Sequence, residues 1–400
     1  MNMVNKFKLA SVMMKTHKTQ IRIKDIGSVL TGRTPSTSNP DNYNAREICF
    51  VKPSDLCEGK INTIEDTEFY ISQKAREQSV CVPINSVLVT CIGIIGKIGI
   101  ATKEIAFNQQ INAIIPDPDL IFYKYLAYLL LAKRRYLSEL ANAPVVPILN
   151  KTNFSDIQLN IHDLPEQKRI AERLDKVQEL IAKQKEQIAK LDLLIKSRFL
   201  DMFGDPISNP KHFFVDSLGK ICDVRDGTHE SPRYVSDGYP LITSKNIVKG
   251  TISLNDVNLI TKKDFDAINK RSKVDRGDIL LPMIGTMGNP ALVIEEPIYA
   301  IKNMALVKFT PESKCSNMYI LHLLYSSFLD NIIQNQQRGG TQKFLALKTI
   351  RALQIPVPPT NLQTQFADFV KSVEQQKEVF STRLSHLETL YKSLMQEYFG

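Results

Sequence analysis

The chain has 400 residues, of which 43% are hydrophobic and 23% are charged, and its formal net charge at pH 7 is +9. At roughly 100–200 residues per domain this length predicts two to four globular domains, and the composition excludes a collagen-like or wholly disordered protein. No run reaches the about 18 apolar residues of a membrane span. The six cysteines include no Cys-x-x-Cys pair, so we expect neither a disulfide scaffold nor a metal site, and a reducing, cytoplasmic location.

The first half of the chain predicts an N-terminal extension followed by a mixed domain. Residues 1–20 carry scattered lysines and no A-x-A-type cleavage site, which argues against a signal peptide. Over residues 21–164, short apolar runs such as SVLVTCIGI alternate with Gly, Pro, Asn and Asp, as strands and turns do. A helical patch at 122–140 interrupts these runs. The fold class we expect here is therefore α+β.

A long helix is predicted over residues 165–204. Pro165 and Glu166 suit a helix start, and from there apolar residues recur at alternating spacings of four and three. Gln184 and Arg198 interrupt the stripe. The apolar positions that form it are Ile170, Leu174, Val177, Ile181, Ile188, Leu191 and Ile195.

The second half of the chain repeats this plan. A second mixed domain is predicted over 205–360, with a helical patch at 318–336, and a second long helix over 361–400. The two helices end in SRFLDMFG and SLMQEYFG at an offset of 196 residues, and Gln167 corresponds to Gln363 at that offset. Lys377 interrupts the second stripe. Its apolar positions are Phe366, Val370, Val373, Phe380, Leu384, Leu387 and Tyr391.

The repeat predicts how the two helices are used. Two narrow stripes of equal length can bury each other, so we expect an antiparallel coiled-coil pair that joins two mixed domains in a pseudo-twofold arrangement. The alternative is a pair of separate surface helices, each packed on its own domain.

The sequence contains no recognisable catalytic motif. The segment GIIGKIG (93–99) has the wrong spacing for a nucleotide-binding loop, and its glycines suit a tight turn. The motifs of an amino-methyltransferase, of a nuclease and of a serine hydrolase are also missing. We therefore expect no catalytic residue in this chain.

The distribution of charge and amide side chains favours a polyanionic partner. The net charge is +4 over 1–164 and +4 over 205–360, against +2 and −1 on the two helices. The loop QRGGTQKF (337–344) combines glycines with cationic and amide side chains. Arg and Lys contact phosphates, Asn and Gln suit adenine, and Arg suits guanine.

Candidate DNA-contacting residues follow from these preferences, although each could also be an ordinary solvated turn residue. At an offset of 192, residues 108–110 are matched to 300–302, and such differences fit two domains that read different sequences. The candidates of the first domain are Arg33, Thr34, Lys52, Ser54, Lys97, Asn108, Gln109, Gln110, Asn150 and Lys151. Those of the second domain are Arg225, Thr228, His229, Arg233, Lys245, Asn289, Lys302, Asn303, Arg338, Thr341, Gln342 and Lys343.

The joins between the mixed domains and the helices carry a family resemblance. They read IQLNIHDLPEQKRIAERLD (157–175) and LQIPVPPTNLQTQFADFVKSV (353–373), and FGDP (203–206) follows the central helix. With this duplicated order, the chain resembles the specificity subunit of type I restriction–modification systems over nearly its whole length. It departs from a strict repeat at Asn361, where the first join has Pro165.

This resemblance implies a non-catalytic DNA-recognition subunit. Each mixed domain would be a target recognition domain for one half of a bipartite site in double-stranded DNA. The helix pair would set the spacing and dock two methyltransferase subunits, and two restriction and translocase subunits would complete the complex. The methyltransferase would use S-adenosylmethionine to methylate adenine and the motor subunit would use ATP and Mg, so no cofactor is implied for this chain.

The physical scale agrees with the resemblance, and two other functions stay open. Residues 170–202 would span about 50 Å as a helix, more than the ~34–36 Å of one turn of B-DNA. A stand-alone DNA-modifying enzyme is one alternative, and it predicts a cofactor or metal motif. A coiled-coil scaffold is the other, and it predicts no salt-dependent DNA binding.

Overall fold

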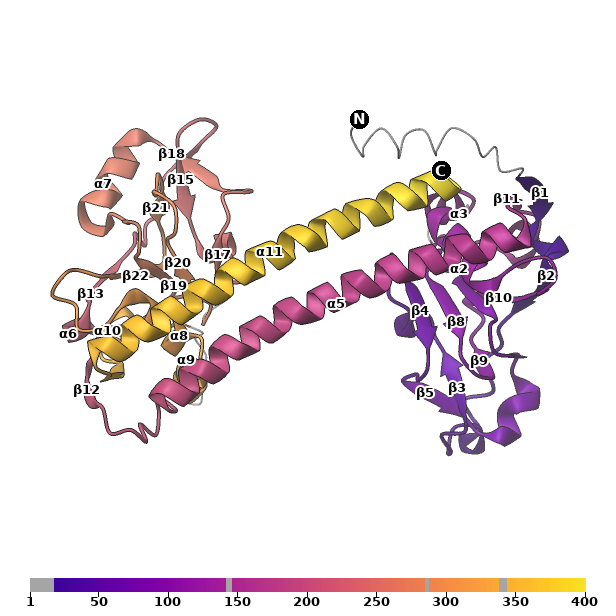
Figure 1. The fold of residues 1–400 in the computed structure, drawn as a ribbon, viewed down its shortest axis with the longest axis horizontal. Helices are drawn as coiled ribbons and strands as arrows, with labels where there is room; N and C mark the ends of the chain where they lie inside the picture. Colours follow the sequence, from indigo (N-terminus) through magenta and orange to yellow (C-terminus); the bar gives the residue numbers. More distant parts are fainter. Residues whose placement is uncertain (1–17, 142–145, 285–287, 338–343) are drawn as a thin grey trace, which may run out of the picture. The chain divides into compact units, whose positions relative to one another are not determined.

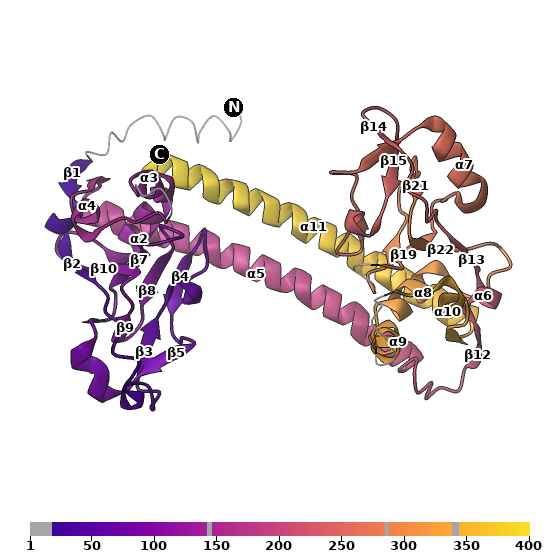
Figure 2. The same ribbon diagram turned by 180° about the vertical axis from the view of Figure 1, so that it is seen from behind.

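The chain folds into two compact units, each of which combines one mixed domain with halves of both long helices. The computed structural model describes residues 18–141, 146–284, 288–337 and 344–400, so residues 1–17 of the predicted N-terminal extension lie outside it. Unit 1 comprises Met1–Gln184 and Arg383–Gly400, and unit 2 comprises Lys185–Thr382. Figures 1 and 2 show the elements of each unit from opposite sides.

Unit 1 is built on two mixed sheets. A five-stranded sheet has the order β2-β10-β7-β8-β4, and a four-stranded sheet has the order β5-β3-β9-β6. The pairs β4–β8 and β3–β9 are parallel and the other pairs are antiparallel. The strands of the first sheet are Gly27–Thr31, Ile111–Pro116, Val87–Thr90, Ile98–Ala101 and Ile61–Ile64, and those of the second are Phe69–Ile71, Ile48–Val51, Ile105–Phe107 and Cys81–Val82.

The remaining elements of unit 1 close this domain. Strand β1 (Thr19–Arg22) pairs antiparallel with β11 (Gln158–Ile161), and so includes the last two residues of the segment predicted as an extension. The helical patch expected at 122–140 forms two helices, α2 (Tyr123–Ala132) and α3 (Arg134–Glu139), and α4 spans Lys151–Ser155. The apolar face of α2 packs into the main core of the unit.

Unit 2 repeats the plan with shorter strands. The sheet β13-β22-β19-β20 corresponds to β2-β10-β7-β8, and a second four-stranded sheet has the order β14-β18-β15-β21. The first comprises Asp223–Asp226, Met304–Lys308, Ile279–Pro282 and Ala291–Leu292, and the second Tyr234–Val235, Asn258–Ile260, Tyr239–Ile242 and Ala300–Ile301. The pairs are β12–β23 (Phe214–Ser217, Gln354–Val357) and β16–β17 (Ile247–Val248, Thr251–Ile252), and the helices are α6 (Leu218–Ile221), α7 (Lys262–Ser272), α8 (Asn317–Leu324), α9 (Ser327–Gln337) and α10 (Leu347–Arg351).

The two long helices are α5 (Leu164–Phe203) and α11 (Thr360–Phe399), each of 40 residues. In unit 1 the guanidinium of Arg173 on α5 donates to the hydroxyl of Tyr398 on α11 over 2.9 Å. In unit 2 the ammonium of Lys377 lies 2.7 Å from Asp192, and the guanidinium of Arg198 lies 5.8 Å from the ring centre of Phe369. Positions on α11 fall as positions on α5 rise, so the halves that meet in unit 2 are antiparallel.

The predicted stripes are buried, with one shift in register. The side chains of Leu174 and Val370 are at most 1% exposed, whereas Ile188 and Phe380 are half-buried. Arg198, expected on the stripe, is exposed, and the adjacent Phe199 is buried in its place. The shift arises because the stripe packs not only on the other helix but also on its own domain: the Phe199 ring stacks on Tyr319 of α8 at 5.8 Å.

A buried glutamine joins each helix to its domain in the same way. The side-chain oxygen of Gln167 accepts from the Phe122 amide at 2.8 Å, and its nitrogen donates to the His162 carbonyl at 2.8 Å. Gln363 repeats this in unit 2 with the Ser316 amide at 2.7 Å and the Pro358 carbonyl at 2.8 Å. The correspondence of the two glutamines in the sequence is therefore a correspondence in structure.

Two properties of the described residues bear on function. Among them, no helix is both long and apolar enough to cross a membrane. Nor does any group of three or more His, Cys, Asp or Glu side chains in the described ranges have the arrangement of a metal site.

Candidate DNA interface

Four segments lie side by side at one end of the five-stranded sheet of unit 1, and we call them row 1. They are residues 32–34, 107–111, 91–92 and 148–150. The amide of Arg33 donates to the Phe107 carbonyl at 3.1 Å, that of Cys91 to Gln110 at 2.8 Å, and that of Leu149 to Cys91 at 2.9 Å. Glycine is required at position 32, because a Cβ there would lie 2.1 Å from the Asn108 carbonyl oxygen.

Row 1 brings several predicted residues together but uses them differently. The Thr34 hydroxyl donates to the side-chain oxygen of Gln109 at 2.5 Å, and Arg33 and Gln109 are exposed. Asn108 is only 7% exposed, and its side-chain nitrogen donates to the side-chain oxygen of Gln110 at 2.9 Å. Asn108 therefore supports the row, and the exposed side chains around it are the ones that a ligand can reach.

Unit 2 contains the equivalent arrangement, which we call row 2: residues 227–229, 301–304, 283–284 and 344–346. The amide of Thr228 donates to the Ile301 carbonyl at 3.0 Å, that of Met283 to Asn303 at 3.1 Å, and that of Leu345 to Met283 at 2.9 Å. These bonds reproduce those of row 1. Both rows thus have the same backbone framework.

The framework corrects the alignment expected from the sequence. Since Thr228 bonds to Ile301 as Arg33 bonds to Phe107, Asn108 corresponds to Lys302 rather than to residue 300. The offset is therefore 194 before the turn, and it falls to 193 after the turn, where Asn303 takes the place of Gln110, because the turn of row 2 is one residue shorter. Sequence matching missed this local deletion, because the identical pair beside it, Ala106 and Ala300, is too weak a signal to set the alignment.

The side chains of row 2 differ from those of row 1. The two ring nitrogens of His229 lie 2.9 Å from the side-chain oxygen of Asn303 and 3.1 Å from the carboxylate of Asp226. The ammonium of Lys302 donates to the Ser231 hydroxyl at 2.5 Å. Row 2 therefore presents a cation and an imidazole where row 1 presents a guanidinium and an amide.

A second group of predicted residues adjoins each row. The Asn108 amide donates to the Val51 carbonyl at 3.1 Å, which places Lys52 next to row 1. The Lys52 ammonium lies 3.0 Å from the centre of the Phe69 ring, and the Lys97 ammonium donates to the Pro53 carbonyl at 2.8 Å, next to the exposed Ser54.

The equivalent turn of unit 2 carries Lys245, which is exposed. The side chain of Asn289 donates to the Ile247 carbonyl at 3.3 Å there, in a place similar to that of Lys97 in unit 1. Each turn therefore contributes cationic or amide groups beside its row.

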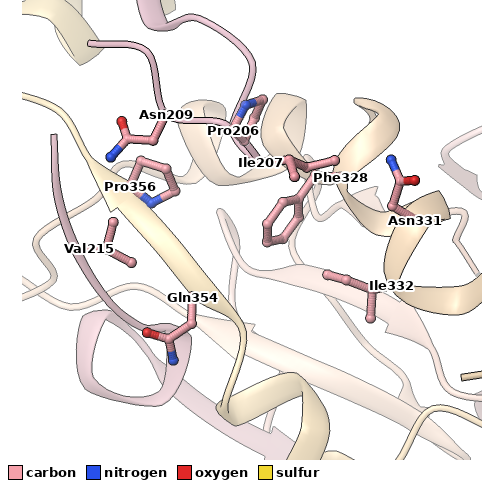
Figure 3. Close-up of a pocket in the computed structure, with 9 residues that line it drawn as sticks. All are labelled: Pro206, Ile207, Asn209, Val215, Phe328, Asn331, Ile332, Gln354 and Pro356. Atoms are coloured by element: carbon pink, nitrogen blue, oxygen red, sulfur yellow. The ribbon is translucent and has the colours of Figure 1, made fainter. Parts of the chain in front are cut away.

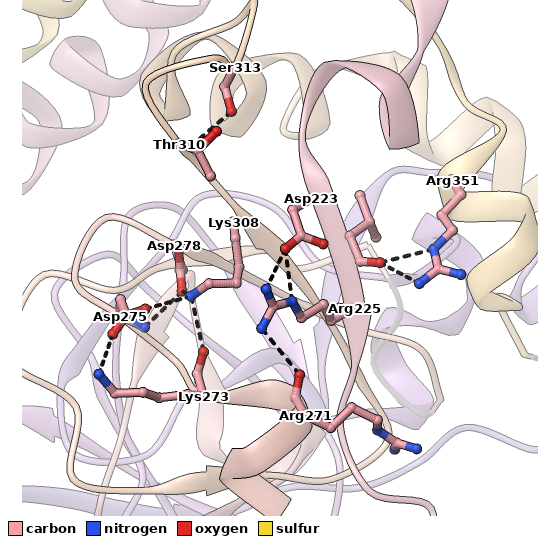
Figure 4. A network of polar contacts seen from close by, with 11 residues as sticks. Asp223, Arg225, Arg271, Lys273, Asp275, Asp278, Lys308, Thr310, Ser313 and Arg351 are labelled. Atoms are coloured by element: carbon pink, nitrogen blue, oxygen red, sulfur yellow. Dashed lines mark hydrogen bonds and ion pairs between the residues drawn. The ribbon is translucent and has the colours of Figure 1, made fainter.

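The remaining predicted residues lie in several different settings. Asn150 caps α4 by accepting from the Asn153 amide at 2.8 Å, and Lys151 beside it is exposed. Arg225 bonds to the Asp223 carboxylate at 2.8 Å, so its charge is already paired (Figure 4). Arg233 is exposed. The positions Arg338, Thr341, Gln342 and Lys343 lie outside the described residues.

One cation beside row 2 was not predicted. The guanidinium of Arg271, at the end of α7, donates to the Gly227 carbonyl at 3.0 Å and lies 3.6 Å from the Asp226 carboxylate. Its sequence signal is weak, because a basic last turn is common in any helix. Only the pairing of α7 with the glycine turn reveals its position.

A polar cluster stabilises the end of the sheet β13-β22-β19-β20 that lies opposite row 2 (Figure 4). The ammonium of Lys308 on β22 lies 2.6 Å from Asp278 and 2.8 Å from Asp275. Burial raises the pKa of Asp278, whereas hydrogen bonds from Lys308 and Lys273 lower the pKa of Asp275. The opposite directions reflect depth: the side chain of Asp278 is 4% exposed and that of Asp275 is 47% exposed.

A pocket of about 320 Å³ lies elsewhere in unit 2, between the segment after α5, the pair β12–β23 and helix α9 (Figure 3). Its lining side chains are apolar or amide, and none is a charged or nucleophilic group. They are Pro206, Ile207, Asn209, Val215, Phe328, Asn331, Ile332, Gln354 and Pro356.

A duplicated framework with divergent polar side chains, joined to two long helices, is the arrangement that the sequence resemblance implies. A family model described as the type I restriction modification DNA specificity domain matches residues 16–192 and again 210–389. The chain belongs to this family. It is thus the DNA specificity subunit of a type I restriction–modification system. It is a non-catalytic subunit that assembles with other subunits into one complex.

Individual relatives cover nearly the whole chain. The type I restriction enzyme MjaIX specificity subunit of Methanocaldococcus jannaschii is 26% identical over 389 residues, covering 90% of this chain and 88% of the relative. The EcoKI specificity subunit of Escherichia coli K12 is 20% identical over 383 residues, covering 88% and 80%. The crystal structure of an S subunit from M. genitalium has the same fold, with a TM-score of 0.58 at 15% identity and coverage of 97% and 98%.

Proposed function

We propose that the mixed domains 21–164 and 205–360 are target recognition domains, and that each reads one half of a bipartite DNA site through its row. The observation that supports this most is the shared backbone framework with different exposed side chains. A common framework keeps one docking geometry, and the substituted side chains change which base edges are accepted.

The charges of the rows suit this role. Arg33 and Lys302 are partly or fully exposed cations beside amide or imidazole groups. Cations bind phosphates and fix the register of a protein on the duplex, whereas amides discriminate bases. Arg225 and Lys308 are already paired with carboxylates, so we assign them to domain stability rather than to DNA.

We further propose that α5 and α11 set the spacing between half-sites and dock two methyltransferase subunits, with two restriction and translocase subunits completing the complex in the cytoplasm. Each helix of 40 residues is about 60 Å long. The methyltransferase would supply S-adenosylmethionine chemistry at adenine, and the translocase ATP and Mg chemistry. A helix of this length suits a spacer longer than one turn of B-DNA.

The test is expression of the chain with its methyltransferase partner, followed by genome-wide mapping of methyladenine. We expect a bipartite motif with a fixed gap. Gln109→Ala should relax only one half of the motif and His229→Ala only the other, at roughly 1–3 kcal/mol per lost base contact. Asn160→Ala, an exposed amide on β11, is the control.

Two results would contradict the proposal. One is a continuous motif, or methylation with no sequence preference. The other is binding of S-adenosylmethionine by the isolated chain, which would favour a stand-alone modifying enzyme.

A further inference from the structure

An apolar pair lies at the outer end of each row. In unit 1, Ile92 and Ile148 form an isolated antiparallel bridge, and in unit 2 Ile284 and Phe344 form the equivalent one. Residues directly opposite in an antiparallel bridge point to the same face, with Cβ atoms about 4.5–5.5 Å apart. Each bridge therefore presents two apolar side chains as one small surface.

These surfaces are open to solvent. Ile148 is 44% exposed, Ile284 is 41% exposed and Phe344 is 39% exposed, while Ile92 is half-buried. Single exposed apolar residues are common on proteins. Here, however, an apolar pair recurs at the same point of a duplicated framework although one member differs, Ile148 against Phe344, which indicates a use that does not depend on one particular side chain.

The pairs adjoin the amide side chains of the rows. The backbone N–H of Cys91, next to Ile92, donates to the backbone carbonyl of Gln110. The backbone N–H of Met283, next to Ile284, donates to the backbone carbonyl of Asn303. Each row thus places an apolar surface one strand away from an amide. In the major groove an A·T pair presents the same combination, because adenine offers N6 and N7 to an amide and thymine offers its methyl group.

We propose that the Ile92–Ile148 and Ile284–Phe344 pairs are apolar contacts for the 5-methyl group of a thymine, one in each half-site. The proposal rests on the proposed function and specifies its chemistry. Two side chains cover an area far below that of a protein interface, which needs on the order of 800 Å² per partner, so a base is the better occupant.

The experiment uses the complex of the full chain with its methyltransferase partner and duplexes that carry the mapped motif. Each thymine is replaced singly by deoxyuridine, which removes only the methyl group. We expect one thymine per half-site at which the replacement weakens binding about three- to fivefold, the contribution of one buried methyl group.

Substitutions then assign each methyl contact to its pair. Ile148→Ser should abolish the thymine preference in one half-site only, and Phe344→Ser in the other only. Matched controls are Ile84→Ser, 57% exposed at the opposite end of β7, and Ile294→Ser, 65% exposed just after β20. Thermal unfolding and assembly with the partner confirm that each variant folds.

Three outcomes would overturn the proposal. The first is that the wild-type complex shows no thymine whose replacement by deoxyuridine weakens binding. The second is that both serine variants keep the thymine preference. The third is that the wild-type complex unstacks a 2-aminopurine at a base step and the serine variants no longer do so, with no change in thymine preference, which would make the pairs wedges between bases. All three leave a bipartite methylation motif intact, whereas failure of the proposed function removes the motif itself.

Discussion

Replacing the buried glutamine at either helix junction should destabilise one unit and spare the other. Gln167 and Gln363 are 0% and 2% exposed, and each makes three hydrogen bonds to backbone groups. Leucine has a similar volume, so Gln→Leu removes the hydrogen bonds without leaving a large cavity.

The expected loss follows from those contacts. Three hydrogen bonds contribute about 1 kcal/mol each, and the stranded amide of Phe122 or Ser316 costs a further ~1–3 kcal/mol. We therefore expect each variant to lose about 4–6 kcal/mol of local stability. At ~1.4 kcal/mol per factor of ten, amide protection in the neighbouring helix should fall by about three to four orders of magnitude.

Hydrogen exchange read by mass spectrometry distinguishes the units, since a chain with two units need not unfold in one step. Gln167→Leu should expose α2, and Gln363→Leu should expose α8. Gln365→Leu, an exposed residue two positions further along α11, should change protection little. The reasoning is refuted if Gln167→Leu costs less than about 1 kcal/mol, or if both units lose protection equally.

Three further predictions concern the helices. Burial lowers the pKa of His322 to about 4, so the folded state disfavours the protonated ring. The free energy of unfolding of unit 2 should therefore fall by up to ~3 kcal/mol as the pH falls from about 6.5 to about 4. Denaturant titrations of His322→Phe should no longer show that pH dependence. In urea unfolding, Phe199→Ala should lower the free energy of unfolding by about 3–5 kcal/mol and Arg198→Ala by less than about 1 kcal/mol. Equal losses would contradict the assignment of Phe199, rather than Arg198, to the buried stripe. Removing one heptad from both α5 and α11 shortens each by about 10 Å, so methylation mapping should show a gap about three base pairs shorter, and an unchanged gap would exclude the helices as the spacer.

The overall plan of the fold was predictable because the sequence contains it as an internal repeat. The matched glutamines and the heptad stripes appear in the sequence at regular intervals, and regular intervals need no knowledge of tertiary contacts. The shift from Arg198 to Phe199 was not predictable, because it depends on the ring of Tyr319, more than a hundred residues away. The local spacing of apolar residues does not reveal a contact with a residue so distant in the sequence.

The candidate interface was predictable only in composition. Residue chemistry pointed to Arg33, Gln109 and His229 as separate positions. Backbone bonds between distant segments place Arg33 and Gln109 together in row 1 and His229 in row 2. The same bonds showed that Asn108 is buried, and they revealed Arg271 beside Gly227. Burial and strand adjacency depend on the folded chain, so neither follows from residue type.

The division of the helices between units has a consequence for synthesis on the ribosome. Unit 2 is one continuous stretch, Lys185–Thr382, whereas unit 1 needs Arg383–Gly400, which is made after all of unit 2. The ring of Tyr125, for instance, packs at 5.3 Å on Phe399, which is translated 274 residues later. Domains usually fold in the order in which they emerge. Here the domain that emerges first must wait for residues 383–400, which are made after all of unit 2, to complete its core, and unit 2 can finish before it.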